Sequence, residues 1–124
     1  MADVPDIPDN RPIELDSAAE LDDLVDERSV VLIEFYTNGC GICRQMEPVV
    51  RLLAGVTGLT VGTINPRADP PLIDRFDVRS VPLLVVFEAG EPIARRAEGF
   101  LGADAALAWI ADETDGAIEA DAIV

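Results

Sequence analysis

The sequence lacks histidine and lysine altogether, and among its 124 residues it has only two cysteines and one tryptophan. The absence of histidine excludes nucleophilic sites of the Ser-His-Asp and Cys-His types and every metal site that depends on imidazole. No apolar run approaches the roughly 20 residues that a membrane-spanning helix needs, and the first ten residues lack the basic and apolar segments of a secretory signal. We therefore expect a cytoplasmic protein that makes no contact with a membrane.

Basic residues are also scarce, since nine arginines stand against 24 aspartates and glutamates and give a formal net charge of -15. Repulsion from phosphate therefore argues against a nucleic-acid partner. Residues 1–27 hold ten acids and one arginine, residues 102–124 hold six acids and no arginine, and residues 28–101 hold eight of each. This distribution favours adaptation to high salt, because molar ionic strength shortens the Debye length to about 3 Å and screens self-repulsion. Acidic ends that only aid solubility are the alternative.

Local patterns predict four helices and four strands in one α/β domain. A capping box at Ser17 and Glu20 starts a helix over residues 17–27, and a nearly continuous apolar run over residues 29–37 is typical of a central strand that is covered on both faces. Helices are also predicted after Cys43 and at residues 69–76 and 103–113. Strands are predicted at residues 59–64, 81–88 and 92–97, the last at a sheet edge. Residues 1–12 are expected to form an extended lead-in.

The two cysteines, Cys40 and Cys43, are separated by two residues and lie where the predicted central strand ends and a helix begins. At a helix start, unpaired backbone amides and the positive end of the helix dipole favour thiolate over thiol at Cys40. Gly41 keeps that sulfur approachable, and Cys43 can attack a mixed disulfide formed at Cys40. This spacing favours a dithiol that cycles between reduced and oxidised forms. A structural zinc site, a structural disulfide and two small buried apolar residues are the alternatives.

Three stretches of the sequence resemble the thioredoxin family: VVLIEFYTNGCGICRQMEP at residues 30–48, VRSVPLLVVFEAGE at residues 78–91 and EGF at residues 98–100. The resemblance covers about residues 14–112 and leaves an acidic N-terminal extension, residues 1–13, and an acidic C-terminal tail, residues 113–124. It implies the thioredoxin fold, in which a central mixed β-sheet is flanked by helices on both faces.

The resemblance also implies roles for single residues. Cys40 corresponds to the attacking thiol and Cys43 to the resolving thiol. A loop with a cis proline, whose backbone pairs with the substrate chain, corresponds to Val81 and Pro82. The implied substrate-binding residues are Gly41, Ile42, Val81, Pro82 and Gly99.

Glu34 interrupts the apolar run of the central strand, at the position where the family carries a buried acid beneath the second cysteine. Burial would hold its carboxyl protonated by desolvation, and such a group can exchange a proton with Cys43. Plainer interpretations stay open: Glu34 could face solvent from a half-exposed strand, and Pro82 could simply start its strand. Gly99 could be a bend before the last helix.

Several positions depart from the pattern of the family. Gly39 replaces an aromatic residue and Ile42 a proline, which changes the groove wall and the balance between thiolate and disulfide. Glu34 replaces an aspartate, and Thr63 stands where a lysine is common, so the usual partner of the buried acid is missing. These changes leave the reaction type intact but leave the reduction potential and the preferred direction open.

Two arginines lie close in sequence to the expected site: Arg44 follows Cys43 directly, and Arg79 lies three residues before Pro82. Their permanent charges would favour the thiolate of Cys40 even in strong salt. Solvated arginines paired with surface acids are the alternative.

The predicted function is the reduction of disulfides in cytosolic proteins, with electrons from a separate reductase of the thioredoxin-reductase type. We expect a monomer that needs no cofactor and no metal. The alternatives are a disulfide oxidant or isomerase, and a non-catalytic module of the same fold that binds extended peptides.

Overall fold

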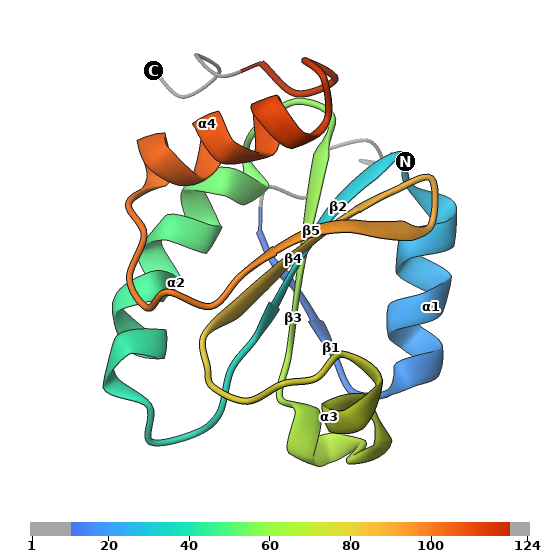
Figure 1. The fold of residues 1–124 in the computed structure, drawn as a ribbon, viewed down its shortest axis with the longest axis vertical. Helices are drawn as coiled ribbons and strands as arrows, with labels where there is room; N and C mark the ends of the chain where they lie inside the picture. The colour runs from blue at the N-terminus through green and yellow to red at the C-terminus, as the bar shows by residue number, and fades with distance from the viewer. Residues whose placement is uncertain (1–10, 120–124) are drawn as a thin grey trace, which may run out of the picture.

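The computed structural model describes residues 11–119, which form a five-stranded mixed sheet in the order β1-β3-β2-β4-β5 (Figure 1). The strands are β1 (Ile13–Leu15), β2 (Val30–Phe35), β3 (Leu59–Ile64), β4 (Leu83–Glu88) and β5 (Glu91–Arg96). β3 runs parallel to β1 and β2, whereas β4 is antiparallel to β2 and β5 is antiparallel to β4. As predicted, β2 is central and β5 is an edge strand.

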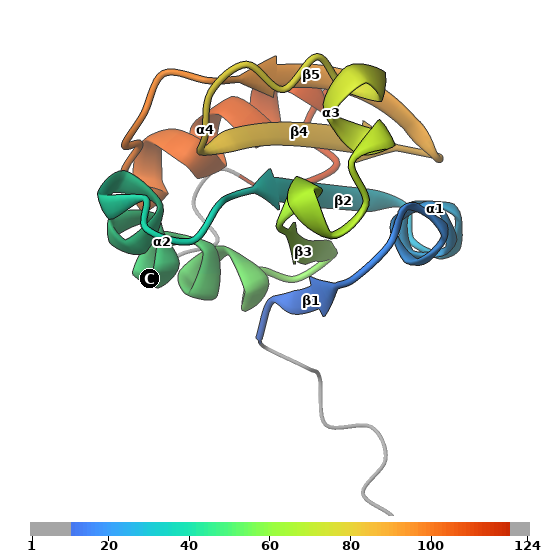
Figure 2. The ribbon, with the colours of Figure 1, turned by 90° about the horizontal axis from the view of Figure 1, so that it is seen from below.

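Helices cover both faces of this sheet (Figure 2). They are α1 (Ala18–Glu27), α2 (Gly41–Ala54), α3 (Pro71–Arg75) and α4 (Ala103–Glu113), and a 3-10 turn, η1 (Pro66–Ala68), precedes α3. One apolar core joins α2 and α4 to the sheet, and the other joins α1 and α3 to the opposite face. Among residues 11–119, no helix is long and apolar enough to cross a membrane.

Strand β2 supplies side chains to both cores, which is why its sequence is almost continuously apolar. Val30 and Leu32 pack on the α2 side, whereas Val31, Ile33 and Phe35 pack on the α1 side. Because side chains alternate along a strand, Glu34 belongs to the same face as Val30 and Leu32. The strand therefore carries this acid beneath α2.

The predicted elements are confirmed with small shifts at their ends. Ser17 caps α1, since its hydroxyl accepts a hydrogen bond from Glu20 N at 3.1 Å, but the Glu20 carboxylate accepts from Asp16 N at 2.7 Å rather than from the cap residue itself. Strand β1 is an addition that the sequence analysis did not predict. It is three residues long and pairs with β3 at one edge of the described sheet.

The acidic ends lie partly outside the described residues, and the predicted domain boundaries stay a prediction. Within the described part of the C-terminal tail, Ile118 is 1% exposed and packs into the core between α2, α4 and the sheet. The hydroxyl of Thr114 donates to the carbonyl of Ile110 at 2.7 Å, so the chain remains attached to α4 just beyond the helix.

Candidate functional site

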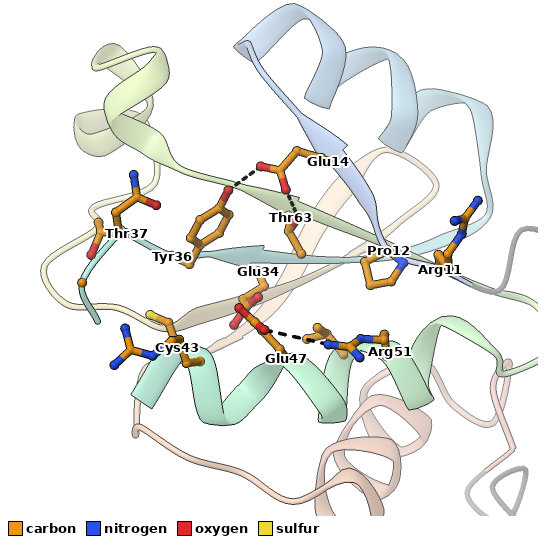
Figure 3. A pocket seen from close by; sticks show the side chains of 14 residues that line it. Arg11, Pro12, Glu14, Glu34, Tyr36, Thr37, Cys43, Glu47, Arg51 and Thr63 are labelled. Carbon is orange, nitrogen blue, oxygen red and sulfur yellow. Dashed lines mark hydrogen bonds and ion pairs between the residues drawn. The ribbon is translucent and has the colours of Figure 1, made fainter. Parts of the chain in front are cut away.

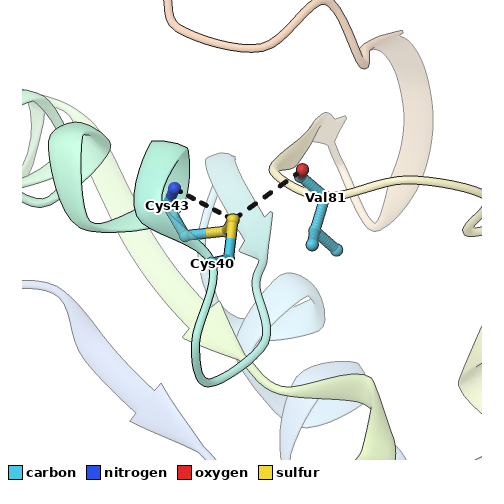
Figure 4. The surroundings of a disulfide bond; sticks show 3 residues. All are labelled: Cys40, Cys43 and Val81. Atoms are coloured by element: carbon cyan, nitrogen blue, oxygen red, sulfur yellow. Dashed lines mark hydrogen bonds between the residues drawn. A yellow bond between two sulfur atoms is a disulfide. The ribbon is translucent and has the colours of Figure 1, made fainter.

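Cys40 and Cys43 form a disulfide at the start of α2 (Figure 4). Cys40 is the N-cap of this helix, and its Sγ accepts a hydrogen bond from the backbone N of Cys43 at 3.1 Å. Cys40 is half-buried, whereas Cys43 is 5% exposed. An incoming sulfur can therefore reach Cys40 far more easily than Cys43. The helix amides around Cys40 also stabilise negative charge on its sulfur once the disulfide is reduced.

The loop before β4 brings a backbone carbonyl to the disulfide. The Val81–Pro82 peptide bond is cis, as the family resemblance implied. The carbonyl oxygen of Val81 lies 4.0 Å from Cys40 Sγ (Figure 4). The loop before β4 thus lies next to the sulfur of Cys40.

Glycines leave the surface around the disulfide open. A Cβ atom added to Gly39 or Gly41, the two neighbours of Cys40, would meet no heavy atom within 4 Å, and the same holds for Gly99. Gly99 has φ +85°, a conformation that favours glycine, in the loop between β5 and α4. This loop is attached to α2 through the backbone N of Leu101, which donates to Met46 Sδ at 3.4 Å.

Two large apolar side chains, one between the cysteines and one directly after Gly99, are exposed. Ile42 is 44% exposed and Phe100 is 54% exposed. Ile42 belongs to the predicted site, but the sequence analysis missed Phe100. The available signal was an aromatic residue directly after Gly99, in a loop that the resemblance placed at the groove. An exposed apolar side chain directly beside a reactive group, as Ile42 is, is typical of a binding surface.

Glu34 is buried, as predicted, and does not face solvent. Its side chain is 3% exposed, and its Oε2 atom has no hydrogen-bond partner within residues 11–119. Burial, reinforced by the negative charges of Glu47 and Glu14, raises the pKa of Glu34 from its ordinary value of 4.5 to about 7. Near neutral pH this carboxyl can therefore both give and take a proton.

A pocket of about 580 Å³ opens beside Glu34 and reaches the disulfide (Figure 3). Thr63, the β3 neighbour of Glu34, donates its hydroxyl not to Glu34 but to Glu14 Oε1 at 3.2 Å. The Tyr36 hydroxyl donates to the other carboxylate oxygen of Glu14. The residues that line the pocket include Glu14, Glu34, Tyr36, Cys43, Glu47 and Thr63.

The two arginines of the thiolate hypothesis have different surroundings. Arg79 is largely exposed and pairs with Asp77, its Nε lying 2.9 Å from Asp77 Oδ1. Arg44 is exposed and lines the pocket together with Cys43. The geometry thus brings Arg44 to the site and gives Arg79 a surface acid as its partner. A role for either residue in stabilising the thiolate stays a prediction.

No group of three or more histidine, cysteine, aspartate or glutamate side chains that could hold a metal ion is found in the described part of the chain. The zinc alternative would therefore need ligands beyond these residues.

Comparisons with known proteins agree with the geometry. The thioredoxin family model matches residues 13–112. Thioredoxin of Mycobacterium tuberculosis is 30% identical over 102 residues, which make up 81% of this chain and 87% of that protein. A bifunctional thioredoxin reductase/thioredoxin of Mycobacterium leprae is 29% identical over 105 residues, which make up 83% of this chain but only 22% of that protein.

A solved structure gives the same result. A mutant thioredoxin from Halobacterium salinarum shares the fold with a TM-score of 0.81 and 34% sequence identity, over 89% of this chain and 96% of that one. The expected thioredoxin fold is confirmed. Because the family match spans all five strands and the four helices except the last residue of α4, and the cysteine pair lies at the start of α2, this chain belongs to the thioredoxin family of thiol–disulfide oxidoreductases.

Proposed function

We propose that the protein reduces disulfide bonds of other proteins in the cytosol, with Cys40 as the attacking and Cys43 as the resolving sulfur. The observation that carries this assignment is the difference in exposure between the two cysteines, since Cys40 is half-buried and Cys43 is 5% exposed. In a reducing compartment a cysteine pair of this kind is catalytic rather than structural.

The exchange proceeds in two steps. In the first, the Cys40 thiolate attacks a substrate disulfide, so a Cys40–substrate disulfide forms, the substrate disulfide breaks, and the leaving thiolate takes a proton from water. In the second, Cys43 gives its proton to ionised Glu34 and attacks Cys40 Sγ, which releases the second substrate thiolate. Two electrons pass from the cysteine pair to the substrate. The product is the Cys40–Cys43 disulfide that the structure contains.

The substrate chain is proposed to lie over the open surface around the disulfide. Backbone groups at Val81 and Pro82 would pair with it, and the absence of side chains at Gly41 and Gly99 leaves room for its approach. Exposed Ile42 supplies apolar contact area there. Phe100, in the loop between β5 and α4, is a further candidate for such contact.

Electrons are proposed to return from a separate thioredoxin-reductase-type protein. The Mycobacterium leprae relative carries both activities in its name and is much longer than this chain, which aligns with 22% of it. That relative supports a reductase as the partner.

Equilibration against glutathione buffers tests the direction of the reaction. We expect the pair to remain mostly disulfide in a buffer poised near about -200 mV and to become half-reduced only at lower potentials, as for a reductant. The reduced fraction is measured by alkylation and mass spectrometry. A pair that is half-reduced at potentials well above about -200 mV would identify an oxidant or isomerase instead.

We also propose that the acidic composition is an adaptation to high salt. The formal net charge of -15 is a source of self-repulsion that salt screens. The melting temperature is expected to rise by several degrees between about 0.1 M and 1 M potassium chloride, since about 1 kcal/mol shifts it by roughly 4 °C for a domain of this size. A sucrose series without added salt is the control. A melting temperature that stays flat or falls with salt contradicts the proposal.

A further inference from the structure

The pocket beside Cys43 contains two carboxylates that the reaction described above does not use. Glu14 comes from β1 and Glu47 from α2, and both line the pocket together with Glu34 of β2 (Figure 3). Glu47 lies four residues after Cys43, one turn further along the same helix. Elements β1, β2 and α2 thus each place one carboxyl group in the pocket where Cys43 must lose its proton.

Within residues 11–119, no hydrogen bond stabilises a negative charge on the Oε2 atom of Glu34. The residue itself is 3% exposed. Its β3 neighbour Thr63 donates its hydroxyl to Glu14 instead. A buried ionised carboxylate without a partner is costly, so this site favours the protonated form.

The charge of Glu14 is fixed at the pocket wall by two hydroxyl donors. Thr63 Oγ1 lies 3.2 Å from Glu14 Oε1, and the Tyr36 hydroxyl donates to Oε2. Burial and this hydrogen bond raise the pKa of Tyr36, so the phenol remains a donor. Glu14 therefore keeps its position while Glu34 titrates.

Glu47 is only weakly neutralised by its neighbour. Its Oε1 lies 3.8 Å from Arg51 Nη2, and both side chains are 61% exposed, so water screens the pair. Arg11 and Arg44, which also line the pocket, are exposed as well. The three arginines thus lie toward solvent, as Glu14 and Glu47 do, while the Glu34 carboxyl lies inside. After burial, Glu47 and then Glu14 make the largest contributions that raise the pKa of Glu34.

We propose that Glu47 and Glu14 are positioning residues of the redox site, whose negative charges, presented from α2 and β1, make Glu34 a strong enough base to take the proton of Cys43. This inference rests on the proposed function, in which Glu34 is the proton acceptor. A carboxylate with ordinary basicity would take the thiol proton less readily, because transfer is most efficient when the acceptor titrates near the working pH. Thr63, which stands where the family often has a lysine, also leaves the pKa of Glu34 high, since the buried residues of the described part of the chain include no cation.

The test is a titration of the Glu34 carboxyl by carbon NMR in the oxidised full-length protein, in which Cys43 does not titrate. We expect a midpoint of about 7 in the parent. Glu47→Gln and Glu14→Gln each lower the midpoint, Glu47→Gln by more. The double variant lowers it furthest but leaves it above 4.5, because burial persists. Glutamine keeps an oxygen that can accept from Tyr36 and Thr63, so the pocket wall is retained.

Two control variants test whether the shift of the Glu34 midpoint depends on charges at the pocket. Arg51→Gln removes the positive charge next to Glu47 and should therefore move the Glu34 midpoint upward. Glu113→Gln removes one exposed charge at the end of α4, away from the pocket, and should leave the midpoint unchanged. Equal midpoints in the parent and in both single pocket variants would overturn the inference, and so would the same shift in Glu113→Gln.

A kinetic measurement separates this inference from the function on which it rests. We expect Glu47→Gln to slow the resolution of a Cys40 mixed disulfide several-fold at neutral pH and to move the rise of that rate to lower pH. Glu34→Gln should remove the rise. If Glu34→Gln leaves the pH profile unchanged, Glu34 is not the acceptor, and the role given to the two carboxylates fails with it. If only the Glu47 and Glu14 variants leave the profile unchanged, the inference fails while the proposed function stands.

Discussion

The Cys40→Ser variant is expected to reduce insulin disulfides no faster than dithiothreitol alone, a loss of more than about 10²-fold. In the parent, the sulfur at this position is the only half-exposed nucleophile of the pair, and the first turn of α2 stabilises its negative charge. A serine hydroxyl has no base beside it and is not ionised, so it cannot attack a disulfide. The measurement is the turbidity of precipitating insulin chains over time.

Cys40→Ser is a sharp test because the substitution should preserve the fold. The native sulfur caps α2 by accepting from Cys43 N at 3.1 Å, and serine is among the preferred N-cap residues. Circular dichroism and thermal unfolding under reducing conditions check that the variant is folded. A folded variant as active as the parent would favour the non-catalytic binding module.

The second large effect concerns stability and pH. In the folded protein the pKa of Glu34 is raised from 4.5 to about 7, chiefly by burial. At 1.36 kcal/mol per pH unit, this difference corresponds to about 3 kcal/mol. A raised pKa means that the folded state binds the proton more tightly than the unfolded chain. The stabilisation by the protonated carboxyl is therefore complete below pH 4.5, declines as the pH rises, and is lost above about 7.

Glu34→Gln should remove this component of the pH dependence. We expect the free energy of unfolding of the variant, relative to the parent, to increase by about 3 kcal/mol between pH 4.5 and pH 8, because only the parent must ionise a buried group. Urea unfolding of both oxidised proteins across this range measures the difference, in which contributions from the other acids cancel. Parallel curves for parent and variant would mean that Glu34 titrates normally.

Most of the fold followed from local patterns in the sequence. The apolar run of β2 predicted a strand buried on both faces, and Ser17 marked the start of α1. The cysteine pair lies between the end of that apolar run and the next helical pattern, and this position was enough to place the redox site at the start of a helix. The cis peptide bond before Pro82 was expected only from the family resemblance, because a proline at a strand start has a simpler explanation.

The pocket could not be found in the same way. Strand β1 is too short for an alternating pattern and is defined by its pairing with β3. Without it, nothing in the sequence brings Glu14 close to Glu34, and Glu47 is an unremarkable exposed acid on a helix. The three carboxylates meet only through the order of the strands, which is a property of tertiary structure. Phe100 was missed for a related reason, since its exposure depends on the loop that Gly99 turns.

The identity of the sulfur that joins the substrate decides the mechanism. The direct measurement is to incubate reduced Cys43→Ser with a disulfide-containing protein, quench with an alkylating agent, and identify the linked cysteine by mass spectrometry. We predict a one-to-one covalent complex through Cys40 that dithiothreitol releases, and no such complex with Cys40→Ser under the same conditions. A complex that forms equally well through Cys43 in the Cys40→Ser variant would contradict the assignment of the attacking sulfur.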